Sequence, residues 1–184
     1  MRYTIVEYVH NVVRNFKKEN GFYIDATVGN GYDTEFLLVG QPAKLIGFDV
    51  QEAAIEQTRK RLLDAGISSG WELKLDGHEN MDKYAQEGSV DIIMFNFGYL
   101  PGTSHEFATK LDTSIQAIEK GLKLLKKGGI MSLCIYSGGD TGFKEKDGIL
   151  NYVKGIDSKE YVVIRSEFCN RKNNPPVPVF VVRE

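Results

Sequence analysis

The sequence has little cysteine and no long apolar segment. Cys134 and Cys169 are its only cysteines among 184 residues, too few for a four-ligand zinc site, and a chain of this length can bury a core without disulfides or metal. Each lies in an apolar run, which predicts two buried free thiols. No stretch approaches the roughly 18 apolar residues of a membrane span, and the N-terminus, with Arg2 and Glu7, lacks the apolar region of a signal peptide. We expect a cytoplasmic protein.

An excess of charge of one sign is also lacking. The chain carries 23 Lys and Arg against 25 Asp and Glu, a formal net charge of −2. This balance argues against a protein that coats nucleic acid through bulk electrostatics, so any RNA contact must be local. Hydrophobic residues at 42% and charged residues at 26% are ordinary for a globular protein. The length predicts one domain over residues 1–184.

Helical periodicity alternates with short apolar runs along the chain. Helices are expected over residues 5–16, 34–39, 52–65, 109–127 and 148–154, and strands over 22–26, 44–48, 71–75, 89–95, 130–136, 161–165 and 177–182. Gly128 and Gly129 are expected to end the fourth helix. The alternation predicts an α/β fold, a doubly wound, mostly parallel seven-stranded sheet with helices on both faces. The last two strands lack a crossover helix, so we predict an antiparallel C-terminal hairpin.

Polar residues follow four successive predicted strands, at the ends where a doubly wound sheet binds ligands. Gly29 and Gly31 follow the first strand and permit close backbone approach to a ligand. Asp49 lies 20 residues after Gly29, a spacing at which an acidic side chain reaches a ribose hydroxyl pair. The third strand ends at Asp76 and the fourth at Asn96. Together they predict a nucleoside site, with Asp49 on the ribose and Asp76 near the base edge.

The loop after the first strand disfavours a dinucleotide. Thr34 stands where a dinucleotide site needs a third glycine, and the carboxylate of Asp25 suits a cationic ligand better than a pyrophosphate. The D-x-x-x-G-x-G loop followed by Asp49 resembles the class I S-adenosylmethionine-dependent methyltransferases, and the resemblance covers the whole chain.

Longer motifs support a narrower resemblance. They are D-A-T-V-G-N-G-Y-D-T from Asp25, N-F-G-Y-L-P-G from Asn96, Y-S-G from Tyr136, and the segment N-N-P-P at 173–176. Together they resemble a bacterial family long labelled rRNA methylases, whose characterised members methylate the amine of 5-aminomethyl-2-thiouridine at the tRNA wobble position. Tyr32 and Gly139 depart from the family pattern, which has histidine at both positions.

The resemblance implies a site for S-adenosyl-L-methionine and a site for the target nucleotide. The implied cofactor-binding residues are Asp25, Thr27, Gly29, Asn30, Gly31, Asp33, Thr34, Asp49, Gln51, Asp76, Gly77, His78 and Asn96. The implied substrate-binding residues are Phe97, Gly98, Tyr99, Leu100, Pro101, Gly102 and Tyr136, with Asn96 and Tyr99 as catalytic residues. Desolvation beside the cofactor's sulfonium would keep the target amine neutral without a dedicated base, and the two tyrosines suit a base flipped out of its stack.

Contacts with the tRNA anticodon stem-loop are expected from local basic side chains. Arg171 and Lys172 are the best candidates, because a tight polar turn can follow a phosphate backbone. No histidine pair has metal-ligand spacing, so we expect no metal. His10 is expected at the surface, and His78 either contacts the cofactor or caps the following helix. A homodimer is compatible with the sequence.

Three hypotheses for function remain open. The first is a methyltransferase for the wobble-uridine amine of tRNA. The second is a class I methyltransferase for rRNA or a small molecule, which the near-neutral charge mildly favours. The third is a nucleotide- or RNA-binding module without turnover, against which the intact Asp25, Asp49 and Asn96 argue. Methylation of a pyrimidine carbon through a thiol adduct is disfavoured, because Cys134 is expected in mid-strand.

Overall fold

The structure, a computed structural model, describes residues 3–40, 44–98, 109–136, 139–172 and 174–184. Its centre is a seven-stranded sheet in the order β3-β2-β1-β4-β5-β7-β6. The strands are β1 (Phe22–Asp25), β2 (Lys44–Asp49), β3 (Trp71–Leu75), β4 (Val90–Phe97), β5 (Leu125–Ile135), β6 (Tyr161–Arg165) and β7 (Val177–Arg183). Among the strands that the structure describes, β7 alone is antiparallel to both of its neighbours, β5 and β6. The predicted mostly parallel sheet with an antiparallel C-terminal hairpin is therefore confirmed.

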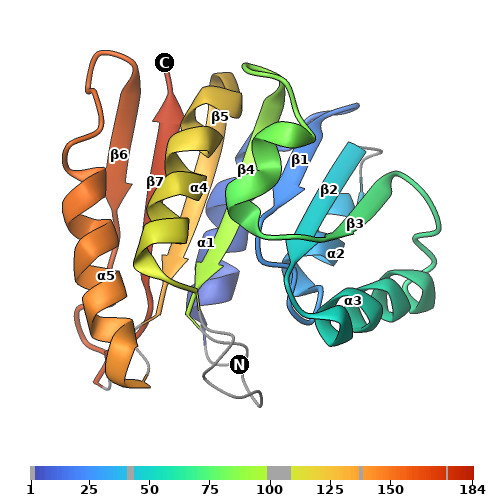
Figure 1. The fold of residues 1–184 in the computed structure, drawn as a ribbon, viewed down its shortest axis with the longest axis horizontal. Coiled ribbons are helices and arrows are strands. Elements are labelled where there is room, and N and C mark those ends of the chain that lie inside the picture. Colours follow the sequence, from blue (N-terminus) through green and yellow to red (C-terminus); the bar gives the residue numbers. More distant parts are fainter. Residues whose placement is uncertain (1–2, 41–43, 99–108, 137–138, 173) are drawn as a thin grey trace.

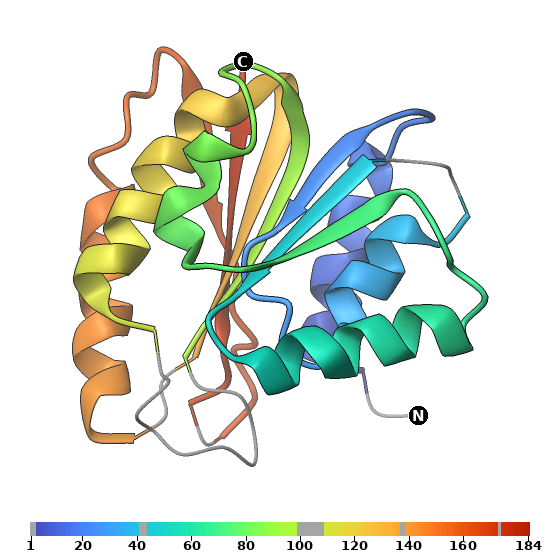
Figure 2. The same ribbon diagram turned by 45° about the vertical axis from the view of Figure 1, so that its right-hand side comes forward.

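Helices cover both faces of this sheet. They are α1 (Ile5–Val13), α2 (Tyr32–Leu38), α3 (Glu52–Asp64), α4 (Leu111–Leu124) and α5 (Gly139–Val153), with short 3₁₀ helices η1 (Arg14–Phe16) and η2 (His78–Lys83). Helices α4 and α5 lie on one face, and α1, α2 and α3 lie on the other (Figures 1 and 2). No helix in the described ranges is both long enough and apolar enough to cross a membrane.

Three details of the sequence prediction are wrong. Helix α4 ends at Leu124 instead of Lys127, because the lysine-rich segment after it already belongs to β5. Helix α5 begins at Gly139, about nine residues earlier than expected, since the G-D-T-G sequence at its start has weak helix propensity and conceals it. Cys169 is exposed in the β6–β7 connection, whereas Cys134 is buried as predicted.

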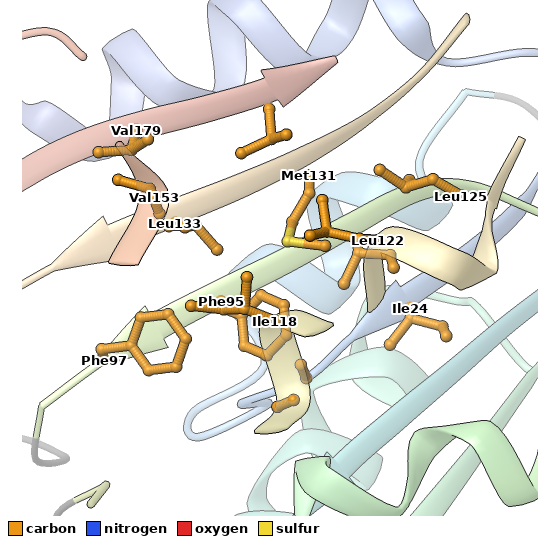
Figure 3. Close-up of a cluster of buried hydrophobic side chains, with 14 of the residues drawn as sticks. Ile24, Phe95, Phe97, Ile118, Leu122, Leu125, Met131, Leu133, Val153 and Val179 are labelled. Atoms are coloured by element: carbon orange, nitrogen blue, oxygen red, sulfur yellow. The ribbon is translucent and has the colours of Figure 1, made fainter. Parts of the chain in front are cut away.

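The alternation of side chains along β4 divides the core into two clusters. Ile93, Phe95 and Phe97 pack toward α4 and α5, in the cluster shown in Figure 3. Ile92 and Met94 belong to the cluster on the opposite face, with residues of α1 and α2. Because successive side chains of a strand point to opposite faces, Asn96 projects to the α1 and α2 side at the carboxyl end of β4. The hydrophobic pattern of this strand thus sets the direction of its terminal polar residue.

Candidate active site

A cleft of about 1190 Å³ opens at the carboxyl ends of the parallel strands. It brings together most of the residues that the sequence predicted, namely Thr27, Gly29, Asn30, Asp33, Asp49, Gln51, Asp76, Gly77, His78, Asn96, Gly98 and Tyr136. It is also lined by residues that the sequence analysis did not select, among them His10, Arg14, Lys17, Phe36, Thr109 and Lys110. The prediction that polar residues at the strand ends form the site therefore located the cleft, but it identified only part of the residues that line it.

The glycine-rich loop after β1 is tied to the end of β2 by Asp49. The Gly29 amide donates to Asp49 Oδ2 at 3.0 Å, and the Gln51 amide donates to Asp49 Oδ1 at 3.0 Å. Gly29 and Gly31 have φ values of 49° and 79°, which favour glycine. Burial raises the pKa of Asp49, although the backbone amides oppose this shift. Each carboxylate oxygen keeps a further acceptor position for a ligand hydroxyl.

Asp25 lies beneath the loop and does not line the cleft. Its carboxyl group is fully buried, accepting from Thr34 Oγ1 at 2.6 Å and from the Thr27 amide at 3.2 Å. Burial, and next the charge of Asp33, raise the pKa of Asp25 to about 7. Thr34 is also fully buried, and Gly31 caps α2 behind the lining. Asp25, Thr34 and Gly31 therefore support the glycine-rich loop from beneath. Any effect that they have on a ligand would act through the backbone of this loop.

The segment after β3 forms a second rigid part of the wall. Asp76 accepts from the Gly77 amide at 2.8 Å, from Asn80 Nδ2 at 2.8 Å and from the Tyr84 hydroxyl at 2.9 Å. His78 is the first residue of η2 and is buried, and among the described residues its Nε2 has no hydrogen-bond partner. Burial lowers the pKa of His78, which keeps the imidazole neutral.

Three side chains from different elements form a chain of hydrogen bonds in the lining of the cleft. Asn96 Nδ2 donates to Asp33 Oδ2 at 2.7 Å, and His10 Nε2 lies 2.6 Å from Asp33 Oδ1. The His10 ring stacks on Phe36, with centroids 3.8 Å apart and planes 5° from parallel. The expectation that His10 lies at the surface is wrong, because its side chain is only 17% exposed and lines the cleft.

The remaining predicted substrate residues divide between the cleft, the core and the surface. Gly98, with φ of 142°, passes so close to Tyr136 that an added Cβ would lie 3.0 Å from the Tyr136 Cβ. The Gly98 amide donates to Thr109 Oγ1 at 2.9 Å, a contact that the sequence did not suggest. Phe97 is fully buried in the core and does not line the cleft. Tyr99, Leu100, Pro101 and Gly102 lie outside the described residues.

Arg171 and Lys172 lie in the β6–β7 connection and do not line the cleft. Arg171 donates to the Tyr3 carbonyl at 2.7 Å, and its guanidinium lies over the Phe168 ring at 5.2 Å. Asn174 and Pro176 of the same connection do line the cleft. Within the described part of the chain, the lysine and arginine side chains that line the cleft are Arg14, Lys17 and Lys110. They come from the segment from α1 into η1 and from the N-terminal cap of α4.

Comparison with known proteins agrees with this arrangement. Residues 45–182 match the model of the family described as "Putative rRNA methylase". The chain belongs to this family. It is 42% identical to a "putative rRNA-methylase" from Clostridium thermocellum, with a TM-score of 0.94 and both chains covered completely. It is 37% identical to a "putative methyltransferase" from Streptococcus mutans solved in complex with SAH, with a TM-score of 0.89 and both chains covered completely.

Two curated relatives add to this comparison. The present chain is 32% identical to the chloroplastic tRNA (mnm(5)s(2)U34)-methyltransferase of Arabidopsis thaliana, over 95% of this chain and 67% of the relative. It is also 32% identical to ribosomal RNA small subunit methyltransferase H of Sulfurihydrogenibium azorense, over 49% of this chain and 32% of the relative. The protein is an S-adenosylmethionine-dependent methyltransferase.

The cleft of this methyltransferase fits S-adenosylmethionine. Asp33, Asp49 and Asp76 line it with acidic groups, which suit a sulfonium cation. The buried His78 Nε2 has no partner within the described part of the chain, so a polar group of a ligand could satisfy it. The positive φ of Gly29 lets the backbone approach a bound molecule closely.

Cys134 cannot serve this methyltransferase as a thiolate nucleophile. It lies within β5 opposite Asn96 and is 3% exposed. Burial raises the pKa of its thiol to about 12, so the group stays protonated at neutral pH. This supports methyl transfer without a cysteine adduct. The described residues also contain no group of three His, Cys, Asp or Glu side chains that could hold a metal ion.

Proposed function

We propose that this methyltransferase N-methylates the 5-aminomethyl group of 5-aminomethyl-2-thiouridine at the tRNA wobble position. The relative from Arabidopsis thaliana supports the substrate class, since its name states that modification. The observation that carries the proposal is the orientation of Asn96. Its amide nitrogen is committed to Asp33, so its carbonyl oxygen is the atom left to accept a hydrogen bond from a substrate amine in the cleft.

We assign the cofactor to the part of the cleft formed by the strand-end loops. Asp49 would accept the ribose hydroxyls, with Gly29, Asn30 and Gln51 along the same wall. Thr27, Asp33, Gly77, His78 and Asn96 complete the lining, with Asp76 near the base. S-adenosylmethionine supplies an electrophilic methyl group. The rigid hydrogen bonds of Asp49 and Asp76 fix this wall before any ligand binds, which lowers the entropic cost of binding.

The site must favour the neutral form of the target amine. An aminomethyl group with a lysine-like pKa of about 10 is mostly protonated at neutral pH. Its lone pair must be free for transfer, so the proton has to leave to solvent first. Asn96 Oδ1 would then accept one N–H of the neutral amine and direct the lone pair, and such placement supplies much of the rate. The proposal therefore implies that transfer accelerates with rising pH until the amine is neutral.

The rest of the cleft has room and chemistry for a nucleotide. Its volume of about 1190 Å³ exceeds the roughly 300–1,000 Å³ of a typical small-molecule site. Burial raises the pKa of Tyr136, which keeps its phenol neutral, and its ring would offer an aromatic surface to a flipped base. Tyr99, Leu100, Pro101 and Gly102 remain predicted substrate contacts. Tyr99 also remains a predicted catalytic residue.

The larger partner would be the tRNA anticodon stem-loop. Arg14, Lys17 and Lys110 line the cleft and would meet phosphates near the target nucleotide. Arg171 and Lys172 remain predicted contacts farther from the cleft. A single domain, a cytoplasmic location and a possible homodimer also remain predictions.

Nucleoside mass spectrometry tests this function. The purified protein, S-adenosylmethionine and tRNA bearing 5-aminomethyl-2-thiouridine should yield a nucleoside with one added methyl group, and tRNA from a deletion strain should accumulate the unmethylated amine. Fully methylated wobble uridine in the deletion strain, with no transfer by the purified protein, would refute the proposal. A methyl group lost from ribosomal RNA instead would favour the rRNA alternative, which the Sulfurihydrogenibium azorense relative represents.

A further inference from the structure

One face of the N-terminal helical segment, from α1 into η1, lines the cleft. Val6, His10, Arg14 and Lys17 follow at intervals of four, four and three residues, so they share one side of the helix. This segment precedes residues 45–182, where the family model matches. The motifs found in the sequence do not include it.

His10 makes the most specific contact on this face. Its Nε2 lies 2.6 Å from Asp33 Oδ1, and because a carboxylate only accepts hydrogen bonds, the imidazole is the donor. The distance is slightly shorter than the roughly 2.7–2.9 Å that is usual for a charge-assisted N–H···O bond. Stacking on Phe36 at 3.8 Å fixes the plane of the ring. The side chains of His10 and Asp33 are 17% and 13% exposed, so water competes weakly for this contact.

The contact determines which way Asn96 faces. Asp33 uses its other oxygen to accept from Asn96 Nδ2 at 2.7 Å. The structure records no donor to Asn96 Oδ1 among the described residues, and Asn96 lines the cleft. An amide turned by 180° would present its NH₂ group instead, and this group cannot accept a hydrogen bond from an amine. Holding the Asp33 carboxylate in place therefore selects the useful orientation of Asn96.

We propose that His10 is a positioning residue for methyl transfer. Through Asp33 it keeps the Asn96 carbonyl oxygen directed into the cleft, where the acceptor amine binds. This proposal rests on the proposed function, because it treats Asn96 as the acceptor for the target amine. The competing explanation is that His10 only packs α1 against Phe36 of α2.

Two variants separate the hydrogen bond from the stacking. His10→Phe keeps an aromatic ring on Phe36 but removes the donor, and His10→Gln keeps an amide N–H at the reach of Nε2 but removes the ring. With saturating cofactor and tRNA, single-turnover transfer should slow about 10- to 100-fold in His10→Phe. His10→Gln should recover most of the wild-type rate. Cofactor affinity by calorimetry and the melting temperature should stay near wild type in both variants.

A second measurement needs no RNA. The side-chain NH₂ signals of Asn96 in an NMR spectrum, assigned by their loss in Asn96→Asp, should move in His10→Phe and stay near their wild-type positions in His10→Gln. If the wild type does not methylate the tRNA amine but these signals behave as expected, the substrate assignment fails and the positioning of Asn96 stands.

Two other outcomes overturn the inference. One is an unshifted Asn96 signal in His10→Phe together with a wild-type transfer rate. The other is a loss of rate and melting temperature in His10→Gln while His10→Phe keeps both, which indicates that the ring only packs against Phe36. If His10→Phe does not fold, His10→Gln decides, because loss of the wild-type Asn96 signals in a folded His10→Gln protein contradicts the role of the hydrogen bond.

Discussion

The cleft has two walls that are held in different ways. On the first wall, formed by the loops after β1, β2 and β3, two backbone amides hold the carboxylate of Asp49. The carboxylate of Asp76 accepts from the Gly77 amide and also from the side chains of Asn80 and Tyr84. On the second wall, His10 of α1, Asp33 of α2 and Asn96 of β4 are joined by side-chain hydrogen bonds. Backbone donors are present whatever the side chains are, whereas each link of the second wall needs one particular residue. We therefore expect the first wall to govern binding and the second to govern rate.

The largest effect is expected on the second wall. Asn96→Ala should lower the single-turnover rate about 10²- to 10³-fold, a loss comparable to removing one preorganised hydrogen-bonding group from an active site. Cofactor affinity should stay within a few-fold, because the Asn96 backbone amide keeps its bond to Thr27 Oγ1 at 2.7 Å. Stopped reactions analysed by nucleoside mass spectrometry, beside calorimetry with the cofactor, measure both quantities.

Asn80 provides the matched control on the first wall. It also donates its side-chain amide to a carboxylate, Asp76, at 2.8 Å. Asn80→Ala should weaken cofactor binding slightly and leave the rate of transfer near wild type. If Asn80→Ala slowed transfer as much as Asn96→Ala does, the proposed division between the two walls would be wrong.

The same difference explains what the sequence could predict. The order of strands and helices, the glycines of the first loop and the positions of Asp49, Asp76 and Asn96 follow from local patterns, and the structure places all of these residues at the cleft except Gly31, which lies just behind it. These features depend on spacing within a few residues of a strand end. The fold could therefore be predicted almost completely, apart from the bounds of α4 and α5 and the start of β5.

Contacts between distant segments could not be predicted in this way. His10 meets Asp33 over 23 residues, and Asn96 meets Asp33 over 63, so the sequence alone did not show that they are neighbours. The one available signal was the shared helical face of Val6, His10, Arg14 and Lys17, whose mixture of apolar and basic side chains resembles an ordinary solvent-facing stripe. Burial of Asp25 and Phe97 likewise depends on how the sheet and helices pack.

The second prediction concerns Asp25, which lies beneath the two walls and next to the charges of Asp33 and Asp49. Its pKa in the folded protein is raised to about 7 from 3.8, so between these values the folded chain holds a proton that the unfolded chain has lost. Stability therefore falls as pH rises through this range and levels off above it. Relative to Asp25→Asn, the wild type should lose about 2–3 kcal/mol of unfolding free energy between pH 5 and pH 8.

Denaturant unfolding of both proteins at several pH values measures this difference. Titrations common to the two proteins largely cancel in the comparison. A wild-type stability that changes with pH in parallel with Asp25→Asn would show that the carboxyl group keeps an ordinary pKa in the folded protein.

The third prediction tests the first wall directly. Asp49→Ala should weaken cofactor binding by about 1.5–3 kcal/mol, because the carboxylate proposed to accept the ribose hydroxyls is lost and the loop loses two backbone contacts. Titration calorimetry gives the affinity. Asp64→Ala, at the exposed end of α3, is the matched control and should bind the cofactor like the wild type. Equal affinities for Asp49→Ala and Asp64→Ala would remove Asp49 from the site.

The smallest effect is expected at Tyr32, where the family resemblance leads us to expect histidine. Its side chain is 60% exposed, with the Arg61 guanidinium 3.7 Å from the ring centroid. Arg61 is held independently, donating to the Asn30 carbonyl at 2.6 Å and to Glu35 at 3.1 Å. Tyr32→Ala should therefore cost only about 0.5–1 kcal/mol of unfolding free energy, the usual worth of an exposed cation–π contact.

Tyr32→Phe should match the wild type, and Tyr32→His should keep both stability and cofactor affinity, as measured by denaturant unfolding and calorimetry. A loss above about 2 kcal/mol in Tyr32→Ala would exceed an exposed contact of this kind. The glycine-rich loop would then depend on a single side chain, as the second wall depends on Asn96. In that case the hydrogen bonds to Asp49 and Asp76 would not by themselves account for the rigidity of the first wall.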